Sequence, residues 1–152
     1  MVKVGESCRE FKLDDQHYRP VSNSDYEGKI MLLSFHPLAW TNVCAKQMVS
    51  LEKNCERFEK LNTVALGLSV DSSPCKLAWA KSLGISKTRL LSDFWPHGEI
   101  SRRYGLFDEK EGTSKRANVI LDESRKVLFA KLYPSSELPD IEQVITFLEA
   151  KK

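Results

Sequence analysis

One stretch decides the fold: Lys29-Ile-Met-Leu-Leu-Ser-Phe-His-Pro-Leu-Ala-Trp-Thr-Asn-Val-Cys44. Residues 29–35 are almost continuously apolar and have the length of a strand, which is typical of a strand covered on both faces. Pro37 ends this strand, because proline has no N–H to give to a sheet. After Thr41 the apolar residues recur at steps of four and three, as on one face of a helix: Cys44, Met48, Leu51, Cys55 and Phe58. The stretch predicts a buried strand, a turn and a helix that ends near Leu61.

The rest of the chain continues the alternation of strands and helices. Strands are predicted at 11–13 and 18–21 around the polar turn 14–17, and at 63–70, 90–92, 118–121 and 127–132. Helices are predicted from Ser73-Pro74, as N-cap and first position, to about Leu83, and at 99–104 and 141–148. The β-α-β units imply parallel strands, and the late hairpin adds antiparallel ones. We expect an α/β fold with a mixed central sheet, helices on both faces and an N-terminal β-hairpin, compatible with a thioredoxin-like fold.

Composition narrows the class of protein. The 152 residues fit one domain, residues 1–152, and are 41% apolar and 29% charged, as in soluble globular proteins. The net charge of +2 gives no strong basic field, so we expect no nucleic-acid partner. No run of 18 apolar residues and no secretory signal is present, so we expect no membrane span and a cytoplasmic location.

The four cysteines, Cys8, Cys44, Cys55 and Cys75, contain no Cys-x-x-Cys pair. This argues against a zinc ribbon and against a thioredoxin-type dithiol site. The three histidines, His17, His36 and His97, are too scattered to predict a metal site, and no glycine pattern predicts a nucleotide site. In a reducing compartment a structural disulfide is unnecessary, which leaves the thiols as candidates for chemistry.

Cys44 is the strongest of these candidates, because it falls in the first turn of the predicted helix. The first amides of a helix lack intrahelical partners and carry the positive end of its dipole, which favours a thiolate. Thr41 can place its hydroxyl beside the sulfur or cap the helix. Pro37 helps to exclude water, and Arg116, at the start of a predicted strand, could supply a guanidinium to the sulfur and to charge that develops on a substrate. The alternative is that Cys44 is only a small buried residue on a helix face.

These residues resemble the signature of the peroxiredoxin family (the AhpC/TSA superfamily). Pro37, Thr41 and Cys44 stand as in its first motif, and 112–122, which contains Arg116, is similar to its second. Residues 91–105 resemble the AhpE-like branch, although His36 replaces the aromatic residue often found before the proline, and Asn42 lies where proline or glycine is common.

The resemblance, which spans about 11–148, implies a thioredoxin fold, no cofactor, a homodimer through the Trp40 and Trp95 loops, and reduction of hydrogen peroxide, organic hydroperoxides or peroxynitrite. It implies that Cys44 becomes a sulfenic acid, that Thr41 and Arg116 orient and polarise the peroxide, and that Pro37 shields the intermediate.

A second thiol must then reduce the sulfenic acid. Cys55, eleven residues further along the same predicted helix, would be about 16 Å away and is better explained as core. Cys75 follows Ser73-Pro74 in the first turn of another helix, where a thiolate is also favoured. If the strands 29–35 and 63–70 are neighbours, both helices begin at one sheet edge. Cys75 is therefore either a resolving cysteine or a bystander, in which case thioredoxin, a glutaredoxin-like protein or a small thiol is the reductant.

Two other functions compete with a thiol peroxidase. A thioredoxin-like disulfide reductase is disfavoured because the position three residues after Cys44 is Gln47 rather than a second cysteine. A non-catalytic thioredoxin-like binding domain would not need Thr41, Cys44 and Arg116 together.

Overall fold

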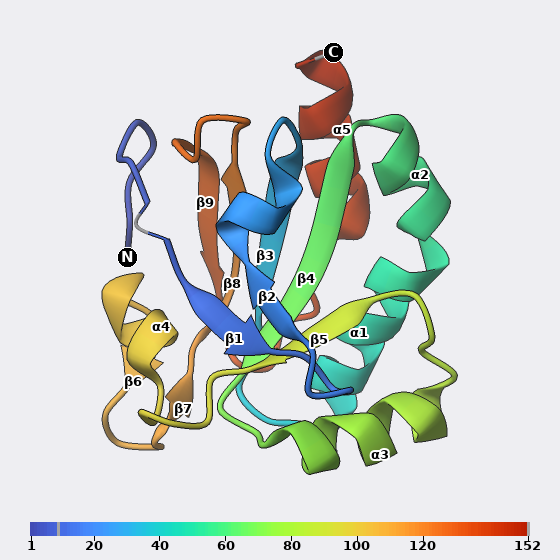
Figure 1. Ribbon diagram of the computed structural model, residues 1–152, viewed down its shortest axis with the longest axis vertical. Coiled ribbons are helices and arrows are strands. Elements are labelled where there is room, and N and C mark those ends of the chain that lie inside the picture. The colour runs from blue at the N-terminus through green and yellow to red at the C-terminus, as the bar shows by residue number, and fades with distance from the viewer. Residues whose placement is uncertain (9, 152) are drawn as a thin grey trace.

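A seven-stranded mixed sheet in the order β2-β1-β5-β4-β3-β8-β9 forms the centre of the molecule (Figure 1). The structure, a computed structural model, describes residues 1–8 and 10–151. Its sheet strands are β1 (Lys12–Asp14), β2 (Pro20–Ser22), β3 (Ile30–Phe35), β4 (Thr63–Ser69), β5 (Arg89–Ser92), β8 (Arg116–Leu121) and β9 (Val127–Tyr133). β3, β4 and β5 are parallel, and β1 and β8 join them antiparallel. The expected mixed sheet and N-terminal hairpin are confirmed.

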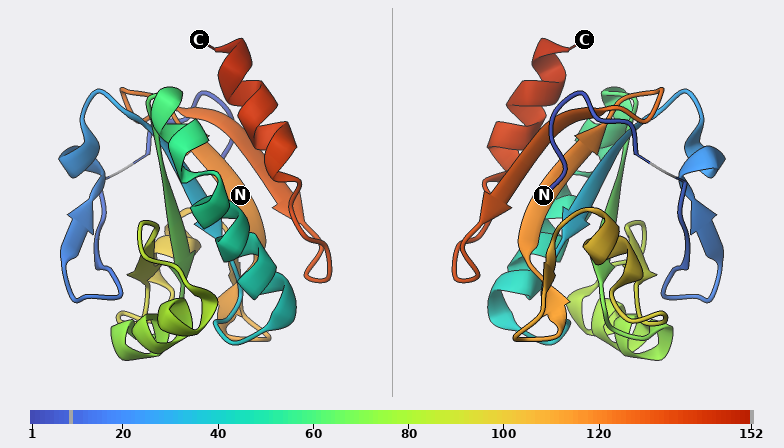
Figure 2. Two further views of the ribbon diagram at one scale, coloured as in Figure 1. Left: turned by 90° about the vertical axis from the view of Figure 1, so that its right-hand side faces the viewer. Right: turned by 90° about the vertical axis from the view of Figure 1, so that its left-hand side faces the viewer.

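The helices cover both faces of this sheet. The helices are α1 (Asn42–Lys53), α2 (Cys55–Lys60), α3 (Ser73–Leu83), α4 (Glu99–Arg103) and α5 (Ile141–Ala150), and the small elements are η1 (Asn23–Tyr26), β6 (Phe107–Asp108) and β7 (Thr113–Ser114). Figure 2 shows α1, α2 and α5 on one side of the sheet, with α4 and the N-terminal segment on the other. The short β6–β7 pair was not predicted, because two residues carry no period.

The position of β3 in the centre of the sheet explains why its residues are almost all apolar. All six of its residues are buried, and they alternate between two cores. Ile30 and Leu32 pack with the helices α1, α3 and α5, whereas Met31, Leu33 and Phe35 pack against α4 and the N-terminal segment. A strand in the centre of a three-layer structure needs apolar side chains on both faces.

Two helix boundaries differ from the prediction. The helix that begins after Thr41 breaks at Asn54, where the Asn54 side chain donates to the Ser50 carbonyl at 2.8 Å and its backbone N–H donates to Leu51 instead. A side chain that takes a helical carbonyl in this way competes with continuation of the helix. The helix α3 has Ser72, not the predicted Ser73, as its N-cap, so Pro74 is its second residue.

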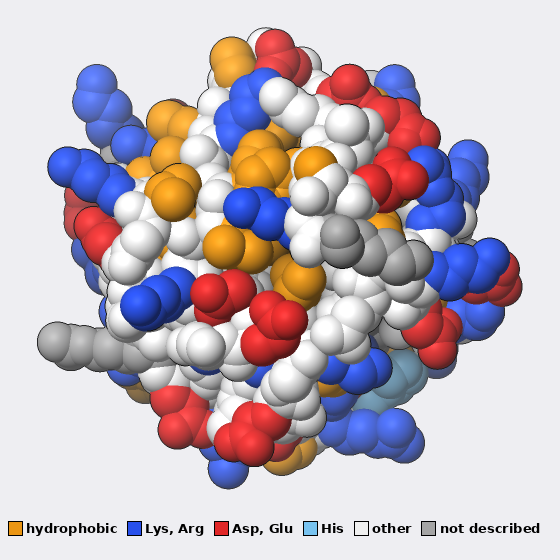
Figure 3. All heavy atoms as spheres, turned by 90° about the horizontal axis from the view of Figure 1, so that it is seen from above, with side chains coloured by type: hydrophobic (Ala, Val, Ile, Leu, Met, Phe, Trp, Pro, Cys, Tyr) orange, Lys and Arg blue, Asp and Glu red, His pale blue; other side chains and the backbone are white. Residues whose placement is uncertain are grey.

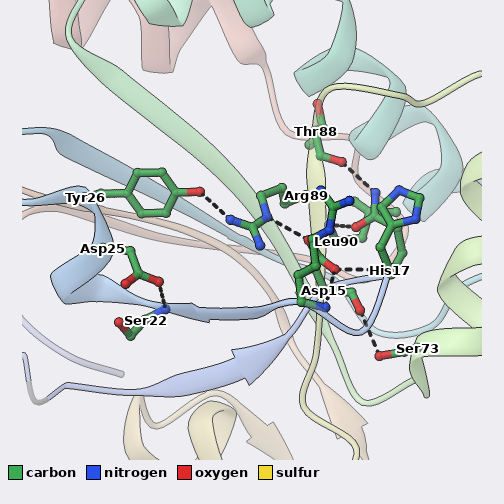
Figure 4. A network of polar contacts seen from close by, with 11 residues as sticks. Asp15, His17, Ser22, Asp25, Tyr26, Ser73, Thr88, Arg89 and Leu90 are labelled. Atoms are coloured by element: carbon green, nitrogen blue, oxygen red, sulfur yellow. Dashed lines mark hydrogen bonds and ion pairs between the residues drawn. The ribbon is translucent and has the colours of Figure 1, made fainter.

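Asp15 and Gln16, in the turn between β1 and β2, are each 2% exposed, and this turn fixes the start of α3 (Figure 4). The Asp15 carboxylate accepts from Arg89 Nε at 2.7 Å and from the amides of His17 and Arg19. Burial alone raises the pKa of Asp15, but these donors outweigh it and hold that pKa below its ordinary value. The Asp15 carbonyl accepts from Ser73 Oγ at 2.9 Å, so the hairpin is bound to the first turn of α3.

The surface is mixed in charge. Figure 3 views the end of the molecule opposite to the start of α1, and basic, acidic and hydrophobic side chains are interspersed on it. Among the described residues, no helix combines the length and the apolar character needed to cross a membrane.

Candidate active site

The turn between β3 and α1 places Cys44 at the third position of α1, where its side chain is 1% exposed. Thr41 is the N-cap residue, and its carbonyl accepts the first helical hydrogen bond from Ala45 at 2.9 Å. Its hydroxyl makes no cap bond and instead donates to the Leu38 carbonyl at 2.7 Å. Thr41 thus closes the turn that leads into α1.

Arg116 lies beside Cys44, as the sequence analysis anticipated. It begins β8, whose antiparallel register with β3 pairs Ala117 with Phe35, so Arg116 stands next to the end of β3. Its Nη1 donates to Cys44 Sγ at 3.3 Å, and its Nη2 donates to the Ser135 carbonyl at 2.8 Å. Residues 72 positions apart in sequence are therefore joined in one buried contact.

Gln47 completes this contact, a role that the sequence analysis did not assign. Its Oε1 accepts from Arg116 Nη1 at 2.7 Å, while its Nε2 donates to Ser34 Oγ at 2.7 Å and to the Phe35 carbonyl at 3.1 Å. Gln47 is 1% exposed and lies one helical turn after Cys44. The signal that could have revealed it is this i, i+3 spacing on the face that carries Cys44.

Arg116 makes no ion pair with a carboxylate among the described residues, although Asp108 and Glu111 line the pocket in front of it. The acceptors of its hydrogen bonds are a thiol sulfur, an amide oxygen and a backbone carbonyl, and its buried Nε has no protein partner. A buried guanidinium is costly unless an anion is near it. The Cys44 sulfur is thus in direct contact with a buried cation.

An open pocket of about 600 Å³ lies in front of this cluster. Pro37, Thr41 and Arg116 contribute to its wall, and Leu38, Leu132 and Tyr133 add apolar surface. A peroxide in this pocket would meet the Arg116 guanidinium and the threonine of the turn, with Cys44 behind them.

Cys75 lies at the corresponding position of α3. Because β3 and β4 pair in parallel, α1 and α3 begin at the same edge of the sheet, as the sequence analysis expected. The expectation that Cys75 favours a thiolate is wrong, however. Burial, and then the negative charge of Asp71, raise the pKa of the Cys75 thiol above its ordinary value.

His36 and Lys76 form a buried pair behind the same edge. Lys76 is completely buried, and its Nζ lies 3.3 Å from His36 Nε2. His36 Nδ1 lies 3.3 Å from the Ser34 carbonyl, which makes Nδ1 the donor and leaves Nε2 to accept from the lysine. Burial lowers the pKa of Lys76 to about 8, although Asp71 opposes this shift. The sequence analysis treated His36 only as a departure from the family pattern and missed Lys76.

The other two cysteines lie elsewhere. Cys55 is the first residue of α2, beyond the break at Asn54, so the distance predicted for one continuous helix does not apply to it. It is half-buried against the helix-side core of the sheet, and burial raises its pKa. Cys8 is half-buried beside Tyr104 on the opposite face. No group of three potential metal ligands occurs among the described residues.

Comparisons with known proteins agree with this geometry. The AhpC/TSA family model matches residues 4–130. The chain is 37% identical over 141 residues to alkyl hydroperoxide reductase E of Mycobacterium tuberculosis, covering 92% of both, and 30% identical to a peroxiredoxin of Thermoplasma volcanium, covering 98% of this chain and 74% of that protein.

Two solved structures are also similar. The reduced 2-Cys peroxiredoxin of Plasmodium vivax matches with a TM-score of 0.89 and 28% identity, over 99% of this chain and 82% of that one. Enterococcus faecalis AhpC, at 24% identity, supports the fold with a TM-score of 0.91 over 99% and 93%. The motifs around Cys44 and Arg116, the thioredoxin-like fold and these relatives together establish that the chain belongs to the AhpC/TSA family of peroxiredoxins, the thiol-dependent peroxidases.

Proposed function

We propose that Cys44 is the peroxidatic cysteine of a single-domain enzyme, residues 1–152, that reduces hydrogen peroxide and organic hydroperoxides in antioxidant defence. The observation that carries this proposal is the contact between Arg116 Nη1 and Cys44 Sγ at 3.3 Å, made by a buried guanidinium that lacks a carboxylate partner. A thiolate is the nucleophilic form of cysteine, and a neighbouring cation favours it.

The reaction requires no cofactor. The Cys44 thiolate attacks the terminal oxygen of the peroxide, the S–O bond forms and the O–O bond breaks. The leaving oxygen departs as an alkoxide or hydroxide and takes up a proton to become an alcohol or water. Arg116 and Thr41 orient the peroxide and stabilise the charge that develops on the leaving oxygen, and Pro37 limits the access of water. Cys44 is left as a sulfenic acid.

Rapid mixing of the reduced protein with hydrogen peroxide and with an organic hydroperoxide tests this proposal. We expect one thiol to be lost per equivalent of peroxide, much faster than free cysteine reacts, and dimedone to label Cys44. The Cys44→Ser variant should lose the fast reaction, whereas Cys8→Ser and Cys55→Ser should retain it. A wild-type rate no greater than that of free cysteine would refute the proposal.

The reductant of the sulfenic acid is a thioredoxin, a glutaredoxin-like protein, a small thiol or Cys75. The structure favours an external thiol over Cys75 while the turn before α1 is closed, because the Cys75 thiol is already bound to Asp71 at 3.8 Å and its pKa is raised. Peptide mapping under non-reducing conditions after one equivalent of peroxide separates the two routes. A Cys44–Cys75 disulfide as the main product in the wild type would contradict the external route.

The proposed assembly is a homodimer in a reducing compartment such as the cytoplasm. Exposed aromatic side chains on the two loops that the family resemblance implicates support the dimer: Trp40 is 58% exposed and Trp95 is 81% exposed. The four free cysteines suit a reducing compartment. Sedimentation at several concentrations tests the dimer, and Trp95→Ser should weaken it.

A further inference from the structure

One carboxylate connects the turn before α1 to the first turn of α3. Asp71 follows β4, and its Oδ2 accepts from the backbone N–H of Ala39 at 2.8 Å and from Ser69 Oγ at 2.6 Å. Its Oδ1 accepts from the Cys75 thiol at 3.8 Å. Ser92 Oγ donates to its backbone carbonyl at 2.6 Å, which fixes the residue from the side of β5. Asp71 thus contacts both the segment that leads into Cys44 and the thiol of Cys75.

The same turn reaches Cys75 a second time, through Trp40. Trp40 has a left-handed backbone with a φ of 67°, an unfavourable conformation for a bulky side chain, so the turn must be held by contacts around it. Its side chain acts as a donor that lowers the pKa of the Cys75 thiol. The turn is therefore linked to the start of α3 by the Ala39–Asp71 bond, and the Trp40 side chain lies near Cys75.

The surroundings of Cys75 shift the pKa of its thiol in both directions, and the upward shifts are larger. Burial and the Asp71 carboxylate raise the pKa of Cys75, whereas the Trp40 donor and the Lys76 side chain act in the opposite direction. The net effect favours the thiol, which is a poor nucleophile compared with the thiolate. The partner of Cys75 is thus opposite in charge to the partner of Cys44.

We propose that Asp71 is a positioning residue that binds the turn before α1 and the Cys75 thiol at once, and so keeps Cys75 from attacking the sulfenic acid of Cys44 while the turn is closed. This inference rests on the proposed function, because it requires the sulfenic acid. In the step that Asp71 restrains, the Cys75 thiolate attacks the Cys44 sulfur, the S–S bond forms and the S–O bond breaks. The expelled hydroxide takes up the proton that Cys75 lost and leaves as water. The sulfenic acid therefore survives long enough for an external thiol to reduce it.

The Asp71→Asn variant tests this inference, because asparagine keeps an oxygen for the Ala39 N–H but removes the negative charge. In a Cys44→Ser background, we expect iodoacetamide to alkylate Cys75 at pH 7 about threefold faster than without the substitution. The gain in thiolate is about tenfold for the loss of one neighbouring charge, and the lower nucleophilicity of a more acidic thiol offsets part of it. Peptide mass mapping distinguishes Cys75 from Cys8 and Cys55.

With Cys44 intact, Asp71→Asn should form the Cys44–Cys75 disulfide about threefold faster after one equivalent of hydrogen peroxide, with a matching loss of dimedone-labelled Cys44. Unchanged or slower alkylation overturns the inference, as does faster alkylation without more disulfide. Failure of wild-type Cys44 to react with peroxide at all would instead refute the proposed function.

A second variant, Trp40→Phe, should change the rate of Cys75 alkylation in the opposite direction. Trp40→Phe keeps an aromatic ring but removes the indole donor to the Cys75 sulfur, so alkylation of Cys75 at pH 7 should become slower, by about threefold. A variant that merely loosens the turn would expose Cys75 and speed its alkylation in both cases. Slower alkylation in Trp40→Phe thus supports the inference even if Asp71→Asn fails to fold, and unchanged or faster alkylation in Trp40→Phe overturns it.

Discussion

Two cysteines occupy similar places in this protein but have opposite neighbours. Cys44 and Cys75 both lie in the first turn of a helix, and the two helices begin at the same edge of the sheet, after the parallel strands β3 and β4. Cys44 contacts the guanidinium of Arg116, whereas Cys75 contacts the carboxylate of Asp71. The amides and the dipole of a helix start are available to both sulfurs.

The difference shows that position at a helix start does not by itself make a cysteine reactive. The dipole is equivalent to about half a charge, so one full charge of either sign within contact distance outweighs it. The charges that face the two sulfurs therefore come from residues elsewhere in the chain. Substitutions that alter those neighbours can break or sharpen the contrast between the two sites.

The largest effect is expected for Arg116→Met, which removes the cation from Cys44. We expect the rate of peroxide reduction to fall by about 100- to 1000-fold, as is typical when one donor to a developing charge is removed. Rapid mixing with peroxide measures the rate, and circular dichroism checks the fold. Lys115→Met, which alters the adjacent basic residue on the wall of the same pocket, should change the rate by less than about threefold. A comparable loss in both variants would mean that only the general charge of the pocket matters.

The sequence predicted the helix start of Cys44 well because the pattern is local. The apolar run before Pro37 and the helical spacing after Thr41 fix a strand, a turn and a helix without reference to the rest of the chain. The sequence did not predict the helix break at Asn54. The apolar residues keep their helical spacing across the break, and a side-chain hydrogen bond interrupts the helix there. The sequence identified the β1–β2 turn only as polar, whereas in the structure Asp15 is 2% exposed because Arg89 and nearby amides satisfy its carboxylate.

The partners of the two thiols could not be derived from local pattern. The Arg116–Cys44 contact was anticipated through family resemblance, since nothing in the spacing of residues 72 apart specifies it. Sequence spacing likewise did not predict the roles of Gln47, Asp71 and the Lys76–His36 pair. Each is a polar side chain whose role depends on a neighbour that the register of the sheet or the packing of a helix brings to it.

Lys76→Met should stabilise the protein at neutral pH, by about 2 kcal/mol. The pKa of Lys76 is about 8 in the folded protein against an ordinary 10.5, so the unfolded chain binds the proton more tightly between these values. Charged Lys76 therefore costs stability below pH 8, and this cost disappears as the pH rises from 8 to 10.5. Methionine removes the cost, less the lost hydrogen bond to His36.

Urea unfolding of the wild type and of Lys76→Met at pH 7 and pH 10 measures this effect. The advantage of the variant should vanish by about pH 10. Lys81→Met, at an exposed position of the same helix, is the matched control and should shift stability by less than about 0.5 kcal/mol. A Lys76→Met advantage that does not depend on pH would indicate better packing rather than relief from a buried charge.

Glu52→Gln tests whether a loss of protein stability at a site distant from Cys44 also lowers the rate of peroxide reduction. Glu52, near the end of α1, accepts backbone N–H groups of the loop after α3, from Ser86 at 2.9 Å and Thr88 at 2.8 Å. Burial raises the pKa of Glu52, but these amides outweigh it and lower the value to about 2 from an ordinary 4.5. Its contribution is thus complete above pH 4.5 and is lost as the pH falls towards 2.

At pH 7 we expect Glu52→Gln to lose about 1.5 kcal/mol of unfolding free energy, measured in urea, with little change in the rate of peroxide reduction. The loss should shrink at pH 3, because Glu52 is largely protonated in the unfolded chain there. Glu56→Gln makes the same change of charge at an exposed position of α2 and should cost far less. A loss of activity as large as that of Arg116→Met would show that the helix starts depend on this distant link.

The smallest expected effect belongs to Gln47→Met, which preserves the size of the side chain but removes its polar atoms. Arg116 would lose the acceptor at 2.7 Å that fixes Nη1 beside Cys44, and the Phe35 carbonyl would lose a donor. The cation stays in place but is less well oriented, so the rate should fall by about tenfold, far less than in Arg116→Met. Gln47→Glu restores an acceptor but also gives Arg116 a carboxylate partner, which competes with the Cys44 sulfur for the same Nη1, so it should not recover the rate. If Gln47→Met leaves the rate unchanged, the sulfur and the Ser135 carbonyl alone suffice to hold the guanidinium, and the contrast between the two cysteines depends on charge without fine positioning.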